Sequence, residues 1–258
     1  MSKINEAFKN NKALIIYVTA GDPNLEATKE IILELNKDGV DIIEVGIPFS
    51  DPLADGPIIQ RASQKALKNG VTLKKIFETL DEIKENITCP LVLMGYYNSI
   101  LNYGIDNFIT DAGNTGISGV IIPDLPFDEE EEFYAKIKEN GIDPILLVAP
   151  NTSEERLKEI SKVCSGFLYC VSIMGVTGDS QAPIEHLKEY SQRVRKYIDI
   201  PLAIGFGIDS PEKVKNIIDY FDGIIVGSAL VKIIDENSDD KAKMLKEIKS
   251  FIKSLKVW

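Results

Sequence analysis

Eight short apolar segments recur along the chain, and this repetition constrains the fold more than any other feature. Each segment is rich in Ile, Val and Leu at both odd and even positions, which is typical of parallel strands covered on both faces. Amphipathic helix patterns separate the segments, so strand and helix alternate eight times. The predicted strands are residues 14–19, 41–47, 90–94, 119–123, 143–149, 166–172, 200–205 and 223–227.

Several helix ends are also predicted. Gly39 follows an amphipathic run at the point where a helix should stop. Thr152 and Glu155 have the spacing of a capping box. Ser210 and Pro211 have the residue types preferred at the N-cap and the first helical position.

We expect a single (β/α)8 TIM barrel of class α/β that spans residues 1–258 as one domain. Eight strand–helix units close a barrel, and a chain of 258 residues has the length such a barrel needs. An open doubly wound sheet is the main rival, but it would show an edge strand of alternating polarity. No predicted strand has that pattern. In a barrel the loops after the strands form the active face.

The charge and the cysteines exclude several classes of protein. A net charge of -11 argues against nucleic acid or an anionic membrane as the main partner. The three cysteines are odd in number and contain no C-x-x-C pair, which favours free thiols in a reducing, cytoplasmic setting. The opening segment lacks the apolar core of a signal peptide, and no apolar run approaches the length of a membrane span. The single histidine, His186, excludes a multi-histidine metal site.

One carboxylate stands inside an apolar strand. Strand alternation places Glu44 on one face with Ile42 and Gly46. If that face lines the barrel, apolar surroundings raise the pKa of Glu44, which suits a group that gives and takes a proton, and small Gly46 leaves room for a ligand. Asp55, in the loop that follows, could reach the same opening. The alternative is a core Glu44 neutralised by a Lys or Arg.

Glycines after the last two strands predict a phosphate site. Gly205, Phe206 and Gly207 end the seventh strand, and Gly227 and Ser228 end the eighth before an apolar helical turn. Glycines allow backbone amides to approach an anion, and a helix N-terminus favours negative charge. Late strands are where barrels commonly bind phosphate. A further glycine, from the long loop after the sixth strand, could complete this site: Gly178.

Absences narrow the chemistry further. The predicted strands contain no lysine, which argues against a Schiff-base aldolase. A nicotinamide fingerprint is also missing. The chemistry that remains is proton transfer by carboxylates, acting on a phosphorylated substrate. Three aromatic side chains at or near strand ends could flank a flat apolar group: Tyr17, Tyr169 and Phe206.

These residues resemble the signature of the tryptophan synthase alpha subunit family. The central block is EVGIPFSDPLADGP from Glu44 to Pro57. The resemblance continues through VTAGDP at 18–23, LMGYYN at 93–98, PDLP at 123–126, GVTG at 175–178, GFG at 205–207 and VGS at 226–228. It therefore covers essentially the whole chain.

The resemblance implies a lyase that splits indole-3-glycerol phosphate into indole and glyceraldehyde 3-phosphate in tryptophan biosynthesis. By this likeness Glu44 protonates the indole ring and then accepts the hydroxyl proton, and Asp55 binds the indole N–H. Tyr169 would support the reacting end. Substrate contacts would come from Tyr17 and Phe206 in the indole pocket, Thr177 beside Asp55, and Gly178, Gly207, Gly227 and Ser228 at the phosphate.

The family also implies a partner. This is a beta subunit that carries pyridoxal phosphate and receives indole through a tunnel in an α2β2 assembly, whereas the alpha chain carries no cofactor or metal. Residues 50–52 and 98–102 would lie near the contact. Three alternatives remain open: a lyase that works without the partner, a non-catalytic sugar-phosphate-binding regulatory subunit, and another barrel enzyme acting on a phosphorylated substrate.

Overall fold

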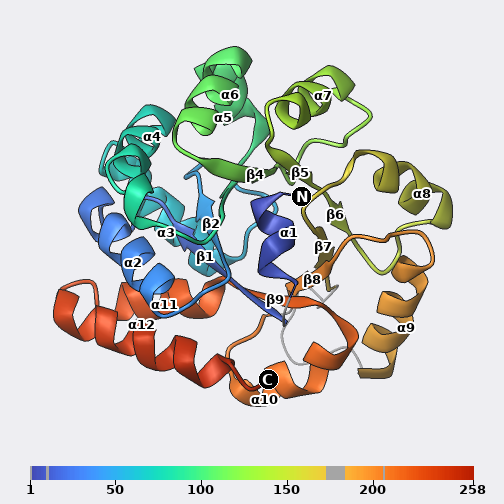
Figure 1. Cartoon of the computed structure of the whole chain (residues 1–258). Coiled ribbons are helices and arrows are strands. Elements are labelled where there is room, and N and C mark those ends of the chain that lie inside the picture. The colour runs from blue at the N-terminus through green and yellow to red at the C-terminus, as the bar shows by residue number, and fades with distance from the viewer. Residues whose placement is uncertain (1, 10–11, 173–183, 206) are drawn as a thin grey trace.

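A sheet of nine parallel strands forms the centre of the molecule (Figure 1). The computed structural model describes residues 2–9, 12–172, 184–205 and 207–258. Within these residues the strands are β1 (Ala13–Thr19), β2 (Ile42–Gly46), β3 (Leu91–Met94), β4 (Ile117–Ile121), β5 (Asp143–Ile145), β6 (Leu147–Val148), β7 (Leu168–Val171), β8 (Leu202–Gly205) and β9 (Gly223–Val226).

The sheet closes into a barrel through its fifth predicted strand. The strand order is β5-β4-β3-β2-β1-β9-β8-β7-β6, and only Leu146 separates β5 from β6 in the chain. The predicted strand over residues 143–149 is therefore divided, because its first half pairs with β4 and its second half with β7. The (β/α)8 prediction is confirmed.

Helices surround the barrel and cover the outer face of its strands (Figure 1). On β2, Ile43 and Val45 point outward into this layer, together with Ile31 and Leu35 of α2. The helices are α1 (Lys3–Ala7), α2 (Leu25–Lys37), α3 (Pro57–Lys68), α4 (Leu73–Asp81), α5 (Tyr97–Tyr103), α6 (Ile105–Asn114), α7 (Glu131–Glu139), α8 (Glu154–Val163), α9 (Ile184–Arg195), α10 (Pro211–Ile217), α11 (Ser228–Glu236) and α12 (Lys241–Leu255), with 3-10 turns η1 (Lys84–Asn86) and η2 (Ile218–Tyr220).

Two of the predicted helix ends are confirmed and one is wrong. Gly39 follows α2 with a φ of 76°, and Ser210 caps α10 with Pro211 at its start. The cap of α8 is Ser153, whose Oγ accepts a hydrogen bond from the Arg156 N–H at 3.2 Å. Thr152 does not cap the helix because its Oγ1 accepts a hydrogen bond from the Ala149 N–H at 2.9 Å, in the turn after β6.

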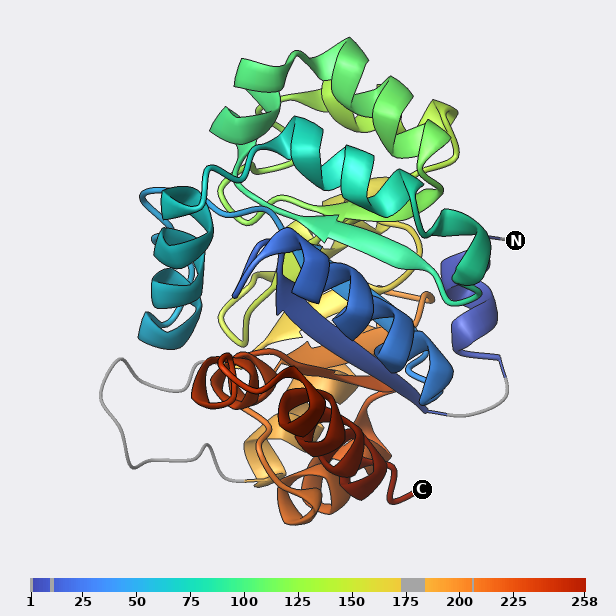
Figure 2. The same ribbon diagram turned by 90° about the vertical axis from the view of Figure 1, so that its left-hand side faces the viewer.

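The short helix α1 closes the end of the barrel at which the strands begin. Figure 2 shows α1 at the opposite end of the barrel from α3. The side chain of Ile4 is fully buried and packs with Ile15, Ile42 and other side chains that fill the barrel interior. The functional groups therefore lie toward the other end, where the strands finish.

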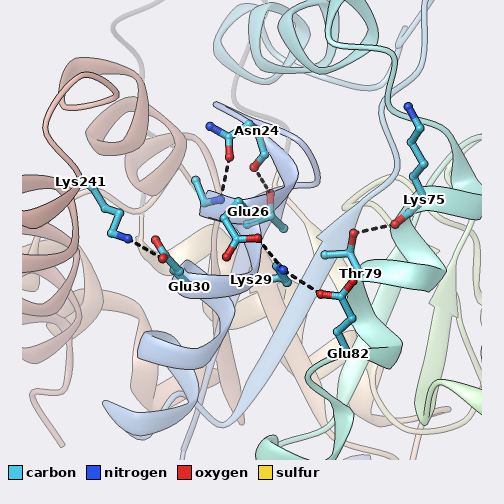
Figure 3. A network of polar contacts seen from close by, with 10 residues as sticks. Asn24, Glu26, Lys29, Glu30, Lys75, Thr79, Glu82 and Lys241 are labelled. Carbon is cyan, nitrogen blue, oxygen red and sulfur yellow. Dashed lines mark hydrogen bonds and ion pairs between the residues drawn. The ribbon is translucent and has the colours of Figure 1, made fainter.

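Charged side chains join neighbouring helices on the outside of the barrel (Figure 3). On α2, Lys29 contacts Glu26 at 2.5 Å and Glu82, at the end of α4, at 2.7 Å. Lys241 of α12 contacts Glu30 of α2 at 2.6 Å. Such exposed pairs contribute little stability individually, but these join α2 to the helix on each side.

Candidate active site

Glu44 lies on the interior face of β2 and is fully buried. Neither of its carboxylate oxygens has a hydrogen-bond partner among the described residues. The described lysines and arginines also form no ion pair with it, so the alternative of a neutralised core glutamate finds no support in this part of the chain. Burial raises the pKa of Glu44 to about 8, which favours a protonated carboxyl near neutral pH.

Two tyrosines stand beside Glu44 on the barrel interior, Tyr17 buried and Tyr169 half-buried. Tyr17 is paired in register with Glu44 across β1 and β2, and its ring lies over Gly46, where an added Cβ would overlap the phenol. The hydroxyl of Tyr169 covers Gly205 in the same way, at 2.7 Å from such an atom. The expectation that Gly46 leaves room for a ligand is therefore wrong, because Tyr17 takes that space.

Asp55 is held over the same opening by the loop between β2 and α3. The hydroxyl of Tyr96 donates a hydrogen bond to Asp55 Oδ2 at 3.1 Å, and the backbone N–H of Ala54 donates one to the same hydroxyl at 2.9 Å. Tyr96 also stacks on Phe49, with ring centroids 5.0 Å apart. The tyrosine thus connects both ends of the loop to the segment after β3.

Burial raises the pKa of Asp55, and the hydrogen bond from Tyr96 partly offsets this effect. Sequence reasoning did not identify Tyr96 as part of the site. Its position one residue before α5, just beyond the end of β3, was the available signal, because side chains that follow barrel strands gather at one end.

A cavity of about 1000 Å³ unites these groups. Its lining includes Glu44, Asp55, Tyr17 and Tyr169, and also Gly207, Gly227 and Ser228, which we call the glycine part of the cavity. The structure thereby brings together seven of the residues predicted from the sequence. The remaining three lie outside the described residues: Thr177, Gly178 and Phe206.

The glycine part of the cavity has the features of an anion site. Gly227 precedes the first turn of α11, and no side chain caps that turn. Gly207 adopts a φ of 58°, and an added Cβ there would meet no atom of the described residues within 4 Å. Uncapped amides at a helix N-terminus, next to an exposed glycine, can bind a phosphate.

No group of three or more His, Cys, Asp or Glu side chains in the described residues is arranged to hold a metal ion. Among the described helices, none combines the length and the apolar character needed to cross a membrane.

Comparison with known sequences gives one consistent result. The family model described as tryptophan synthase alpha chain matches residues 4–257. The chain is 92% identical to the tryptophan synthase alpha chain of Petrotoga mobilis, over the full length of both chains. It is 48% identical to that of a Thermoanaerobacter species, with 99% of each chain covered.

Solved structures show the same likeness. A tryptophan synthase alpha subunit from Legionella pneumophila superposes with a TM-score of 0.91 at 34% identity, covering 99% of this chain and 97% of that one. A chain of the tryptophan synthase complex from Pyrococcus furiosus superposes with a TM-score of 0.86 at 37% identity, covering 95% and 98%.

Proposed function

Because the chain belongs to the tryptophan synthase alpha chain family, we propose that the cavity around Glu44 and Asp55 is its active site. The chain is a lyase that cleaves indole-3-glycerol phosphate to indole and glyceraldehyde 3-phosphate in tryptophan biosynthesis. The observation that carries the assignment of the site is a buried carboxyl group that faces a large cavity and whose oxygens have no hydrogen-bond partner in the part of the chain that the structure describes.

Glu44 acts first as an acid and then as a base. Its protonated carboxyl gives a proton to C3 of the indole ring. The resulting carboxylate accepts the proton of the glycerol hydroxyl as the carbon–carbon bond breaks, and this releases indole and the aldehyde. A pKa of about 8 suits both steps, because a group that titrates near the working pH exchanges protons efficiently in each direction.

Asp55 stabilises the intermediate between these steps. Protonation of C3 places positive charge on the ring nitrogen, and an ionised Asp55 accepts a hydrogen bond from the ring N–H. Buried Tyr17 and half-buried Tyr169 line the cavity beside Glu44, and their rings limit the access of water to its carboxyl. We also assign two further residues to the indole end of the site: Thr177 beside Asp55, and Phe206 in the indole pocket.

The substrate's phosphate binds at the glycine part of the cavity. We assign Gly207, Gly227 and Ser228 to it, together with Gly178. The uncapped first turn of α11 supports this assignment, because its amides and the positive end of the helix favour an anion. Binding the phosphate there fixes the distance between the glycerol chain and Glu44.

The test of the site is indole release from indole-3-glycerol phosphate by Glu44→Gln, with the beta subunit present. Turnover should fall by about 10²- to 10⁴-fold, because the amide cannot exchange the proton. Exposed Glu131 of α7 offers a control, and Glu131→Gln should match the wild type. Both variants should still bind an indole-alkyl phosphate. Wild-type turnover in Glu44→Gln would refute the mechanism.

The partner of the chain is a tryptophan synthase beta subunit. We propose an α2β2 assembly in which the partner carries pyridoxal phosphate and receives the indole. The proposed contact includes residues 50–52 and 98–102. Two exposed leucines support it, because Leu53, next to the first range, is 94% exposed and Leu101 of α5, within the second range, is 48% exposed. Tyr96 holds the two loops together, so a partner on this surface would act on the loop that carries Asp55.

Leu53→Ser tests this contact. The variant should bind the beta subunit about tenfold more weakly, because burial of an exposed leucine side chain contributes roughly 1.5 kcal/mol. The thermal midpoint of the isolated chain and its turnover without the partner serve as controls and should not change. Unaltered affinity would place the contact elsewhere.

We further propose that residues 1–258 form one domain, since a single closed sheet extends over the described part of the chain. We also propose a cytoplasmic location, because the cysteines form no disulfide. Cys89, Cys164 and Cys170 are all free thiols, and the biosynthetic activity is consistent with a reducing compartment.

A further inference from the structure

The wall of the cavity near Gly207 carries a cation that is absent from the assignments above. Lys213, in the first turn of α10, lines the cavity. Its Nζ donates a hydrogen bond to the Gly207 carbonyl oxygen at 3.2 Å and forms an ion pair with Asp209 Oδ2 at 2.8 Å. The lysine side chain is 27% exposed, so it is partly buried where it lines the cavity.

A second lysine on the same wall is in a different situation. Lys232 of α11 lies 3.7 Å from Glu236, and both side chains are about 60% exposed. It forms no hydrogen bond to a glycine of the proposed phosphate site among the described residues, whereas Lys213 contacts Gly207 directly. Of these two cations, Lys213 is the one whose ammonium group is held beside a glycine of the proposed phosphate site.

The charge of the whole chain makes a local cation useful. A net charge of -11 repels a phosphorylated substrate at long range. Backbone amides and a helix N-terminus supply only partial charges. A lysine ammonium adds a full positive charge and up to three donors, and a partly buried position protects its field from screening by salt.

We propose that Lys213 binds the phosphate of the substrate through its ammonium group, and that Asp209 holds this group beside Gly207 while the site is empty. The inference rests on the phosphate site proposed above and adds a residue that makes the chain selective for a dianionic ligand. The cavity wall carries two other charged side chains here, Lys232 and Glu236. Among the described residues, neither forms an ion pair or a hydrogen bond with Lys213.

The direction of each effect follows from the charges. Lys213→Gln removes the cation and should weaken phosphate binding, whereas Lys213→Arg keeps the charge and should restore most of it. Asp209→Asn removes an anion from the site and releases the ammonium group, so binding should become stronger. Lys215, on the same helix but exposed and away from the cavity, offers a control with the same charge change, Lys215→Gln.

The experiment has two parts, both with the full chain. In the assembly with the beta subunit, Lys213→Gln should raise the KM for indole-3-glycerol phosphate about five- to tenfold with kcat changed less than about twofold. Its KM should also increase less steeply with salt. Asp209→Asn should lower the KM about twofold. Lys215→Gln should leave KM unchanged.

The second part measures binding without turnover. Titration calorimetry with inorganic phosphate, and with an indole alcohol that lacks phosphate, should show a loss of affinity in Lys213→Gln for phosphate alone. Equal loss for the alcohol would mean that Lys213 only shapes the Gly207 turn, which would overturn the proposal. Equal effects of Lys213→Gln and Lys215→Gln would also overturn it. Because phosphate binding needs no catalysis, failure of the proposed chemistry at Glu44 would be visible separately.

Discussion

The carboxyl group of Glu44 opposes folding as the pH rises. Its pKa is raised from 4.5 to about 8 by burial in the folded protein, so the folded state binds this proton more tightly than the unfolded state does. Between these two pH values the folded chain keeps the proton that the unfolded chain loses. The contribution of Glu44 to stability therefore becomes less favourable as the pH increases across this range.

Glu44→Gln should remove this dependence, because an amide does not titrate and has no charge to bury. Relative to the wild type, the variant should gain roughly 3 kcal/mol in unfolding free energy between pH 5 and pH 8. Urea unfolding at both pH values measures the difference. If the unfolding free energies of the two proteins changed equally with pH, the Glu44 carboxyl would not be buried without a partner.

Tyr96 controls the ionisation of Asp55. Tyr96→Phe removes the hydrogen bond that favours the charged carboxylate. The pKa of Asp55 should rise further, and the acid limb of the kcat/KM profile should move to higher pH, with about a tenfold loss of kcat/KM. Tyr103 of α5 makes a similar contact with Asp111 away from the cavity, so an unchanged profile in Tyr103→Phe is the control.

The sequence predicts some of these residues and not others for physical reasons. Glu44 is conspicuous because a charge interrupts an apolar strand, and Asp55 follows it closely in the chain. Tyr96 is not conspicuous because its partner is 41 residues away, and only the arrangement of two loops brings the groups together. The same holds for Lys213, which looks like an ordinary surface lysine on a helix. Thr177, Gly178 and Phe206 stay predictions.

At the scale of the element, periodicity predicts the existence of strands and helices better than their ends. The strand over residues 143–149 is divided because it changes its pairing partner at Leu146, and no local pattern specifies a partner. The cap of α8 is displaced by one residue because Thr152 is already used by the preceding turn. Both differences arise from contacts outside the segment itself.

The packing of β1 against β2 depends on the absence of a side chain at Gly46. Gly46→Ala should destabilise the protein by about 1–3 kcal/mol, because the methyl group would overlap Tyr17. Gly113 of α6 has open space around it and a helical position. Gly113→Ala should therefore stabilise the protein by up to about 1 kcal/mol. Thermal unfolding of both variants tests the pair, and destabilisation of equal size would contradict the account.

For the whole molecule, stability and activity should be separable along the barrel axis. Ile4 of α1 is fully buried at the end away from the cavity. Ile4→Ala should lower the unfolding free energy by about 2–5 kcal/mol, yet leave the KM for indole-3-glycerol phosphate unchanged in the protein that remains folded. Exposed Lys3 of the same helix provides the control Lys3→Ala. A changed KM would mean that the two ends are coupled.

The position of α1 also determines how the substrate enters the barrel and how the products leave it. In the part of the chain that the structure describes, α1 covers the end at which the strands begin, and Ile4 packs among the interior side chains there, so that end is closed as an exit route. The arriving ester and both departing fragments must then share the passage on the other side. A subunit docked across that passage would set the order in which the fragments leave and would decide whether indole escapes to water.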